Sequence, residues 1–250
     1  MPRLITLLTD FGTADGYVGE MKGVLASLAP SATIIDVAHD VAPHDVDGAR
    51  LALARYWRRF PEGTVHLVVV DPGVGGARAA LAASSEGRIL VGPDNGVLSP
   101  ALLHASARCV SLAVPSGAAP TFHGRDVFAP AAARLALGAS LETLGAVEGD
   151  PIIRRTPEAT RRDDGAVQGA VITVDRFGNA VTNLLAMRGG QVQVAGLSLP
   201  LRRTYADAEP GSPVALVGSS GLVEIAVRDG SAAERLGIGR GSSVVLLPLR

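Results

Sequence analysis

The segment that most restricts the fold is residues 65–70, Val-His-Leu-Val-Val-Val, which is apolar on both faces and ends at Asp71-Pro72-Gly73. A strand with this composition is buried on both sides, as are the central strands of a parallel sheet that is covered by helices. The segments around it alternate between short apolar runs and longer stretches with helical spacing. This alternation predicts an α/β N-terminal domain with a mainly parallel sheet.

The apolar spacing predicts the elements of this domain, which we place at residues 1–150. We expect strands at 4–9, 32–37 and 65–70, and two shorter strands at 81–84 and 89–91 around a Glu86-Gly87 turn. We expect helices at 17–28, 46–60 and 126–137.

The character of the chain changes after residue 150. Residues 151–165 combine prolines, arginines and acidic residues with little apolar periodicity, which is typical of an exposed linker between domains. In residues 166–250, short β-rich segments are separated by Gly, Asn, Asp and Pro, at 170–174, 191–194, 214–217, 222–227 and 243–247. They predict a small all-β C-terminal domain, a barrel or a sandwich.

Charge and cysteine content restrict the classes of partner. The 23 basic and 24 acidic residues leave a formal net charge of -1, too small to favour a nucleic-acid backbone or an anionic membrane surface. The single cysteine, Cys109, permits neither an intramolecular disulfide nor a cysteine-based zinc site within one chain. No uncharged run reaches the roughly 18 residues of a membrane span, and the N-terminus lacks a secretory apolar region. We therefore expect a cytoplasmic protein without nucleic-acid or membrane partners.

Polar residues next to the predicted strands and helices are the first candidates for a ligand site. Ligands of parallel sheets bind at the carboxyl ends of strands, where Asp10 follows the first strand and Asp71 the third. Each aspartate would serve equally well as the cap of a helix or turn. His123 lies before a predicted helix, where anions are favoured, and it also fits a structural loop histidine.

Two further polar groups have weaker patterns. The spacing of His39-Asp40 and His44-Asp45 matches no metal-ligand pair on a helix, so we predict no metal site. In the second domain, Phe177 and Asn179 place an aromatic ring beside an amide, a combination that suits a heterocyclic base. A hairpin turn explains the same residues.

In combination and in this order, the motifs of the chain resemble the SAM hydroxide adenosyltransferase family, which is related to the fluorinating and chlorinating enzymes that act on S-adenosylmethionine (SAM). The resemblance rests on Thr9-Asp10-Phe11-Gly12-Thr13, Val70-Asp71-Pro72-Gly73-Val74-Gly75, Gly92-Pro93-Asp94-Asn95-Gly96, Phe122-His123-Gly124-Arg125-Asp126, Phe177-Gly178-Asn179 and Glu224-Ile225-Ala226. It implies a C-terminal β-barrel and a homotrimer, with active sites between the N-terminal domain of one subunit and the C-terminal domain of a neighbour.

The resemblance also implies a reaction, the hydrolysis of SAM to adenosine and L-methionine by attack of water or hydroxide at C5′ of the ribose. The Asp-Arg-His triad of the family falls on Asp71, Arg78 and His123. The halogenating relatives keep a halide pocket with aromatic residues in place of Asp71 and His123, so we expect water as the nucleophile. SAM is then the substrate, and neither a cofactor nor a metal is expected.

The remaining site residues that the resemblance implies divide according to the part of SAM that they contact. They are Asp10 for the ribose hydroxyls, Phe177, Asn179 and the Val227 backbone for adenine, and Asp15, Asp175 and Ser219 for the methionine end, with Glu224 also in the substrate-binding set. The chain departs from halogenating relatives at His44, where they have an aromatic residue, and at Ser220, where some have an arginine.

Two other functions are compatible with the same residues. A SAM-dependent halogenase would need other side chains at Asp71 and His123. A protein that binds or senses SAM or adenosine would keep the nucleoside site and turn over negligibly. Analysis of the products separates the three.

Overall fold

The computed structural model of the chain describes residues 3–185 and 189–247, so residues 1–2 of the predicted first domain and residues 186–188 and 248–250 of the predicted second domain lie outside the described part. The chain divides into two compact units, Met1–Arg155 and Thr156–Arg250. Within the described ranges, no helix has the length and apolar character needed to cross a membrane.

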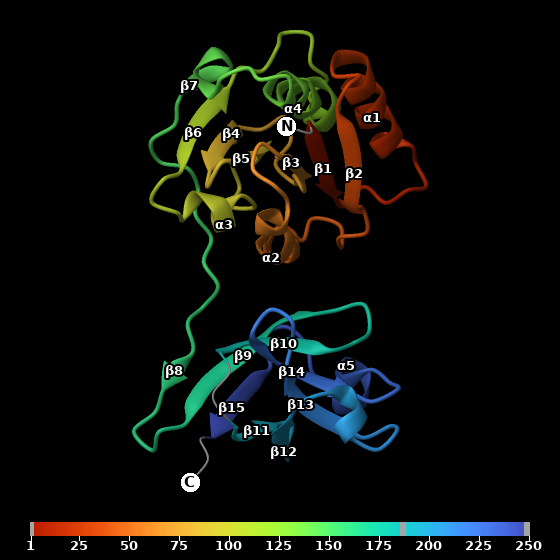
Figure 1. Ribbon diagram of the computed structural model, residues 1–250, viewed down its shortest axis with the longest axis vertical. Coiled ribbons are helices and arrows are strands. Elements are labelled where there is room, and N and C mark those ends of the chain that lie inside the picture. Colours follow the sequence, from red (N-terminus) through yellow and green to blue (C-terminus); the bar gives the residue numbers. More distant parts are fainter. Residues whose placement is uncertain (1–2, 186–188, 248–250) are drawn as a thin grey trace. The chain divides into compact units, whose positions relative to one another are not determined.

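The first unit is built on a seven-stranded sheet with helices on both faces (Figure 1). In spatial order, its strands are β2 (Thr33–Ala38), β1 (Leu4–Thr9), β3 (Val65–Val69), β5 (Arg88–Pro93), β4 (Ala80–Ser85), β6 (Arg108–Leu112) and β7 (Gly145–Val147). The pairs β2–β1, β1–β3 and β3–β5 are parallel. The pairs β5–β4, β4–β6 and β6–β7 are antiparallel.

The prediction of a mainly parallel sheet is therefore wrong, because the sheet is mixed. Strands β4 and β5 are joined through Glu86 and Gly87, which both have positive φ, 46° and 72°. A two-residue turn of this kind connects antiparallel neighbours directly. The antiparallel part continues into β6 and β7, which were not predicted. The parallel part contains β1 and β3, so the strand ends that carry Asp10 and Asp71 still share one edge.

Helices cover both faces of this sheet, in two sets (Figure 1). The helices are α1 (Tyr17–Leu28) and α4 (Ala129–Ala136) on one face, and α2 (Val46–Tyr56) and the short α3 (Ser99–Leu102) on the other. Because side chains alternate along a strand, Ile5 and Leu7 of β1 pack in the core beneath α1 and α4, whereas Leu8 packs against the α2 side. A π-helical turn, Gly124–Phe128, precedes α4 and directly follows His123. Such turns occur often at functional sites.

The second unit is a closed β-barrel, which confirms the predicted all-β C-terminal domain. Around the ring, its strands are β9 (Val167–Val174), β10 (Ala180–Leu185), β14 (Leu222–Val227), β13 (Pro213–Val217), β12 (Leu197–Arg202), β11 (Gln191–Val194) and β15 (Ser243–Leu247). Pairing of β10 with β9 closes the ring, and β8 (Thr160–Arg161) adds to β9 outside it. Closure leaves the ring without exposed strand edges. A five-residue helix, α5 (Ala232–Leu236), packs against the barrel core.

Candidate active site

The parallel pairing of β1 and β3 brings the two predicted strand-end aspartates to one edge of the sheet. Thr9 pairs with Val69, so Asp10 and Asp71 follow their strands at nearly the same level. The backbone N–H of His44 donates to Asp10 Oδ2 at 2.8 Å. His44 has a φ of 66°, a left-handed conformation that is uncommon for a residue other than glycine and often marks a functional site.

Asp71, Arg78 and His123 form one buried cluster, here called the Asp71–Arg78–His123 cluster. Arg78 Nε donates to Asp71 Oδ1 at 2.9 Å, and Arg78 Nη2 donates to Asp71 Oδ2. The same Nη2 lies 2.9 Å from Nδ1 of His123. The side chains of Asp71 and Arg78 are 5% and 9% exposed, and His123 is 5% exposed. These three residues were predicted from the sequence, and the structure brings all three together.

The donors in this cluster fix the state of the imidazole. A guanidinium has no acceptor, so Nδ1 of His123 accepts from Arg78 and the proton of the neutral ring lies on Nε2. Burial and the nearby charge of Arg78 lower the pKa of His123, and the more weakly opposing charges of Asp71 and Asp126 do not reverse this. His123 is therefore neutral at pH 7 and presents an N–H donor.

Arg78 keeps one further donor. Its Nη1 is buried and has no hydrogen-bond partner within the described part of the chain. A buried donor of this kind costs free energy unless a bound group satisfies it. The cluster therefore combines two donors, on Arg78 and His123, with the Asp71 carboxylate as acceptor, a set that can hold and orient a single water molecule.

A chain of side chains supports the loop that begins at Asp10. Thr9 Oγ1 lies 2.9 Å from His39 Nδ1, and His39 Nε2 lies 2.9 Å from Asp36. Lys22 Nζ contacts the other oxygen of Asp36 at 2.5 Å. Burial acts to raise the pKa of Asp36, but Lys22 and His39 hold that pKa below its usual value. The backbone oxygen of His39 also accepts from Gly12 N at 2.7 Å.

Because His39 is hydrogen-bonded to Thr9 and Asp36, it is not available for a metal site with Asp40, His44 and Asp45. No group of three or more His, Cys, Asp or Glu side chains that could hold a metal occurs in residues 3–185 and 189–247.

Three aromatic rings connect this loop to the segment that carries His123. Phe11, Tyr17 and Phe122 meet edge to face, with centroid distances of 6.0, 5.8 and 5.4 Å. Such pairs contribute beyond their buried area. Tyr17 was not predicted from the sequence, because it is the first residue of α1 and its ring meets Phe122 only in the folded chain.

In the second unit, a pocket of about 730 Å³ is lined by all three residues that were predicted to contact adenine. It is lined by Phe177, Asn179, Thr204, Tyr205, Ala206, Val227, Arg228, Asp229 and Gly230. Phe177 is 77% exposed, so its aromatic ring remains available for stacking. Tyr205, which sequence analysis missed, donates its hydroxyl to Glu224 Oε1 at 2.5 Å. Glu224 itself is 7% exposed and thus reaches the pocket through Tyr205.

Asp175 organises the turn that presents Phe177 and Asn179. Its Oδ1 accepts from the backbone N–H of both residues at 2.9 Å, and its Oδ2 accepts from Asn179 Nδ2 at 3.1 Å. The structure therefore confirms the hairpin-turn interpretation of this motif, and the ligand interpretation stays a prediction. The predicted contact of Asp175 with the methionine end stays a prediction.

The other two residues predicted for the methionine end lie in exposed loops. Asp15 lies in the exposed loop before α1, and Ser219 lies in the exposed turn between β13 and β14. Within the barrel, Ser219 is at the opposite end of β14 from Val227. The structure therefore does not bring Ser219 to the pocket.

Both parts of the chain are similar to parts of known proteins. Residues 5–145 match the SAM hydroxide adenosyltransferase N-terminal domain, and residues 169–245 match the C-terminal domain. A Thermus thermophilus protein named (R)-S-adenosyl-L-methionine hydrolase is 46% identical, over 98% of this chain and 100% of that protein. A fluorinase from Actinopolyspora mzabensis is 30% identical over 96% of each chain.

A solved structure has the same fold throughout. The crystal structure of an uncharacterized conserved protein from Thermotoga maritima superposes with a TM-score of 0.89 at 33% identity, covering 98% of this chain and 100% of that one. Both family domains occur in order along the chain and the fold is shared over nearly its whole length. The chain therefore belongs to the SAM hydroxide adenosyltransferase family.

Proposed function

We propose that the protein hydrolyses SAM to adenosine and L-methionine, with water attacking C5′ of the ribose. The observation that carries this proposal is the buried Asp71–Arg78–His123 cluster at the sheet edge where Asp10 also lies. The 46% identical relative named as a SAM hydrolase supports it, and the named fluorinase is more distant at 30%. SAM is the substrate, and the reaction uses no resident cofactor.

The difficult part of this reaction is the activation of the nucleophile, not the departure of the leaving group. Methionine leaves the sulfonium as a neutral thioether, so the leaving group needs no proton. Water is a weak nucleophile, and the cluster binds and orients one molecule in line with the C5′–S bond. His123 Nε2–H and Arg78 Nη1 donate to the water oxygen. Asp71 accepts a water proton, because a carboxylate that is paired with one guanidinium still has free lone pairs.

Charge is balanced during this step. As the C5′–O bond forms and the C5′–S bond breaks, the positive charge of the sulfonium passes to the incoming oxygen, which becomes strongly acidic. The proton then leaves by way of the Asp71 carboxylate and reaches solvent. The burial of the cluster strengthens these electrostatic contacts and excludes competing water.

The rest of the site binds the substrate. Asp10 accepts hydrogen bonds from the ribose hydroxyls, Phe177 stacks on adenine, and Asn179 both donates to and accepts from the base, with the Val227 backbone as a further contact. Asp15, Asp175 and Ser219 contact the methionine end, where carboxylates would pair with the ammonium group.

The working form in this proposal is a homotrimer. Its active sites combine the N-terminal domain of one subunit with the barrel of a neighbour. The division of the predicted residues between two units, with the cluster in one and the nucleoside pocket in the other, supports this arrangement. The protein acts in the cytoplasm, without a metal and without nucleic acid, which is in keeping with a net charge of -1 and a single cysteine.

Product analysis tests this function. The purified protein is incubated with each sulfonium epimer of SAM, with and without EDTA and with and without chloride or fluoride, and products are followed by chromatography with mass detection. We expect equimolar adenosine and methionine that EDTA does not reduce. Because the name of the relative specifies the (R) form, we expect the (R) epimer to react faster. Formation of a 5′-halogenated adenosine, or intact SAM in a protein that binds adenosine, would contradict the proposal.

A further inference from the structure

The loop that carries Asp71 and Arg78 connects two strands that are not neighbours. It runs from β3 to β4, and the spatial order β3–β5–β4 places β5 between them. The loop therefore crosses the end of β5. The residues that directly follow β5, Asp94 and Asn95, lie where β3 ends and β4 begins.

Hydrogen bonds from these two residues fix both ends of the loop. Asn95 Nδ2 donates to the backbone oxygen of Val70 at 2.9 Å, directly before Asp71. The backbone N–H of Asp94 donates to the oxygen of Ala79 at 2.9 Å, directly after Arg78. The turn after β5 therefore sets the separation of the two segments from which the aspartate and the arginine project.

We propose that Asn95 is a positioning residue for the Asp71–Arg78–His123 cluster, a role that rests on the proposed function. Its amide holds the Val70 carbonyl and so sets the direction in which the chain leaves β3. That direction decides whether the Asp71 carboxylate meets both Nε and Nη2 of Arg78. A two-point contact of this kind depends on orientation as well as distance.

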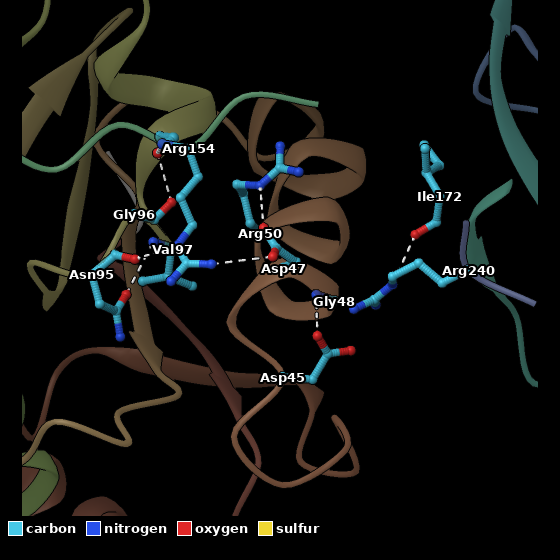
Figure 2. A network of polar contacts seen from close by, with 11 residues as sticks. Asp45, Asp47, Gly48, Arg50, Asn95, Gly96, Val97, Arg154, Ile172 and Arg240 are labelled. Carbon is cyan, nitrogen blue, oxygen red and sulfur yellow. Dashed lines mark hydrogen bonds and ion pairs between the residues drawn. The ribbon is translucent and has the colours of Figure 1, made fainter. Parts of the chain in front are cut away.

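Asn95 is itself firmly held, as Figure 2 shows. Its Oδ1 accepts from Val97 N at 3.1 Å, and its backbone oxygen accepts from Arg154 Nε at 2.8 Å. Arg154 also contacts Asp47 at 3.2 Å and lies against Gly96, where an added Cβ would be only 2.3 Å from Arg154 Cγ. The donor to Val70 is thus preorganised from both sides, and Gly96 is required for the close approach of Arg154.

The far side of the loop is also constrained. Gly75 has a φ of 73°, and a Cβ there would lie 2.3 Å from the backbone oxygen of Pro120. The middle of the loop therefore packs against the segment that leads to His123. With Pro120 on one side and Asn95 at the base, a shift of Val70 moves Asp71 relative to Arg78, its hydrogen-bond partner.

The test uses Asn95→Asp, which keeps the acceptor for Val97 N but removes the amide donor to Val70. The matched control is Asn183→Asp in the barrel. Asn183 Nδ2 also donates to a backbone oxygen, of Pro157, and its Oδ1 accepts from Ala170 N, both at 2.8 Å. We expect Asn95→Asp to lower kcat at least about tenfold with KM for SAM changed less than about threefold, because misplaced catalytic groups reduce turnover more than binding. The control should change kcat less than about threefold.

A second measurement does not depend on activity. In protein labelled with ¹⁵N-arginine, the Arg78 Nε–H signal should be protected from solvent exchange in the wild type and in Asn183→Asp, and lose protection in Asn95→Asp. Arg154→Met probes the same role from outside the turn, because it removes the guanidinium that holds the Asn95 carbonyl. It should give a smaller loss of kcat at unchanged KM.

The outcomes separate the two proposals. Wild-type kcat and a protected Arg78 signal in Asn95→Asp would overturn the positioning role and leave SAM hydrolysis standing. A wild type that does not hydrolyse SAM, combined with loss of Arg78 protection in Asn95→Asp, would overturn the proposed function and support the positioning role. If Asn95→Asp does not fold, an unchanged kcat in Arg154→Met overturns the positioning role.

Discussion

A neutral, buried histidine is the residue from which the pH dependence of the site follows. Burial and Arg78 lower the pKa of His123, so the ring becomes charged only in acid. A charged ring can no longer accept from Arg78 at Nδ1. We predict that kcat is constant from about pH 7 to 9. It decreases at pH values lower than the usual histidine pKa of about 6.5. A kcat profile of the wild type beside His123→Asn measures this, and an acid limb of equal size in the variant would assign the fall to another group.

Loss of the Asp71 carboxylate should reduce catalysis much more than it reduces adenosine binding. Asp71→Asn keeps the size of the side chain but removes the anion that pairs with Arg78 and takes up the water proton. We predict a fall in kcat on the order of 10² to 10⁴, as for loss of a proton acceptor, with the adenosine Kd changed less than about threefold. Steady-state kinetics and calorimetry measure the two quantities. Asp164→Asn, at an exposed residue paired with Arg162, is the control. Parallel losses of both quantities would contradict this division of roles.

Among the elements, β14 carries Glu224, whose buried carboxylate holds the Tyr205 hydroxyl at the nucleoside pocket. Tyr205→Phe keeps the ring and removes that donor. We predict that adenosine affinity falls about threefold to tenfold, which corresponds to the loss of one ordinary hydrogen bond of about 0.7–1.4 kcal/mol, while kcat at saturating SAM changes little. Ser198→Ala, which removes an exposed hydroxyl donor of the barrel that does not line the pocket, should leave adenosine affinity unchanged. An unaltered Kd in Tyr205→Phe would show that the hydroxyl does not position the ring.

Strand β3 carries His66, which is fully buried and hydrogen-bonded to Thr6 at 2.8 Å. Burial, with a smaller effect of Arg88, lowers the pKa of His66 from 6.5 to about 4. Between these values the unfolded chain binds more protons than the folded one, so stability falls as pH decreases from 6.5 to 4.

We predict that this contribution costs about 3 kcal/mol of unfolding free energy at the acid end of the window. Urea unfolding at several pH values measures it, and His66→Leu should reduce the slope. Equal slopes in the wild type and the variant would exclude His66 as the source.

The fold was predictable where the apolar period was strong. The strand at 4–9 and the helix at 17–28 lie where their spacing placed them. Strand direction was not predictable, because an alternating or continuous apolar run fits parallel and antiparallel pairing alike. Strand β12, Leu-Ser-Leu-Pro-Leu-Arg, was missed because a proline argues against a strand, and β7 because three residues carry no measurable period.

Some residues of the candidate site were likewise predictable from the sequence, and others were not. The position of Asp10 and Asp71 followed from the rule for parallel strand ends. Arg78 and His123 lie 45 residues apart in the sequence, and only the family resemblance joined them before the structure did. Tyr205 carried no signal, and Asn95 belonged to a family motif that gave it no role. The roles of both depend on partners that only the folded chain brings near, Glu224 and the Val70 carbonyl.

At the scale of the whole molecule, the proposed trimer makes a prediction that mixing can test. If each active site joins two subunits, His123→Ala and Asn179→Ala damage opposite halves of it. When equal amounts are unfolded and refolded together, we predict a return of about a quarter of wild-type activity, because that share of sites in a cyclic trimer receives two intact halves. Each variant refolded alone should stay inactive. No recovery in a mixture shown by light scattering to be trimeric would place both halves of the site in one subunit.

The proposed reaction depends on the attack of water at carbon, and the fate of the water oxygen tests this step most directly. The protein is incubated with SAM in water enriched in oxygen-18, and adenosine is analysed by mass spectrometry with fragmentation. We predict one labelled oxygen per adenosine, located at the 5′-hydroxyl, and no label in methionine. Adenosine that forms without label at the 5′-oxygen would contradict the account, because its C5′–O bond would not have been made from water.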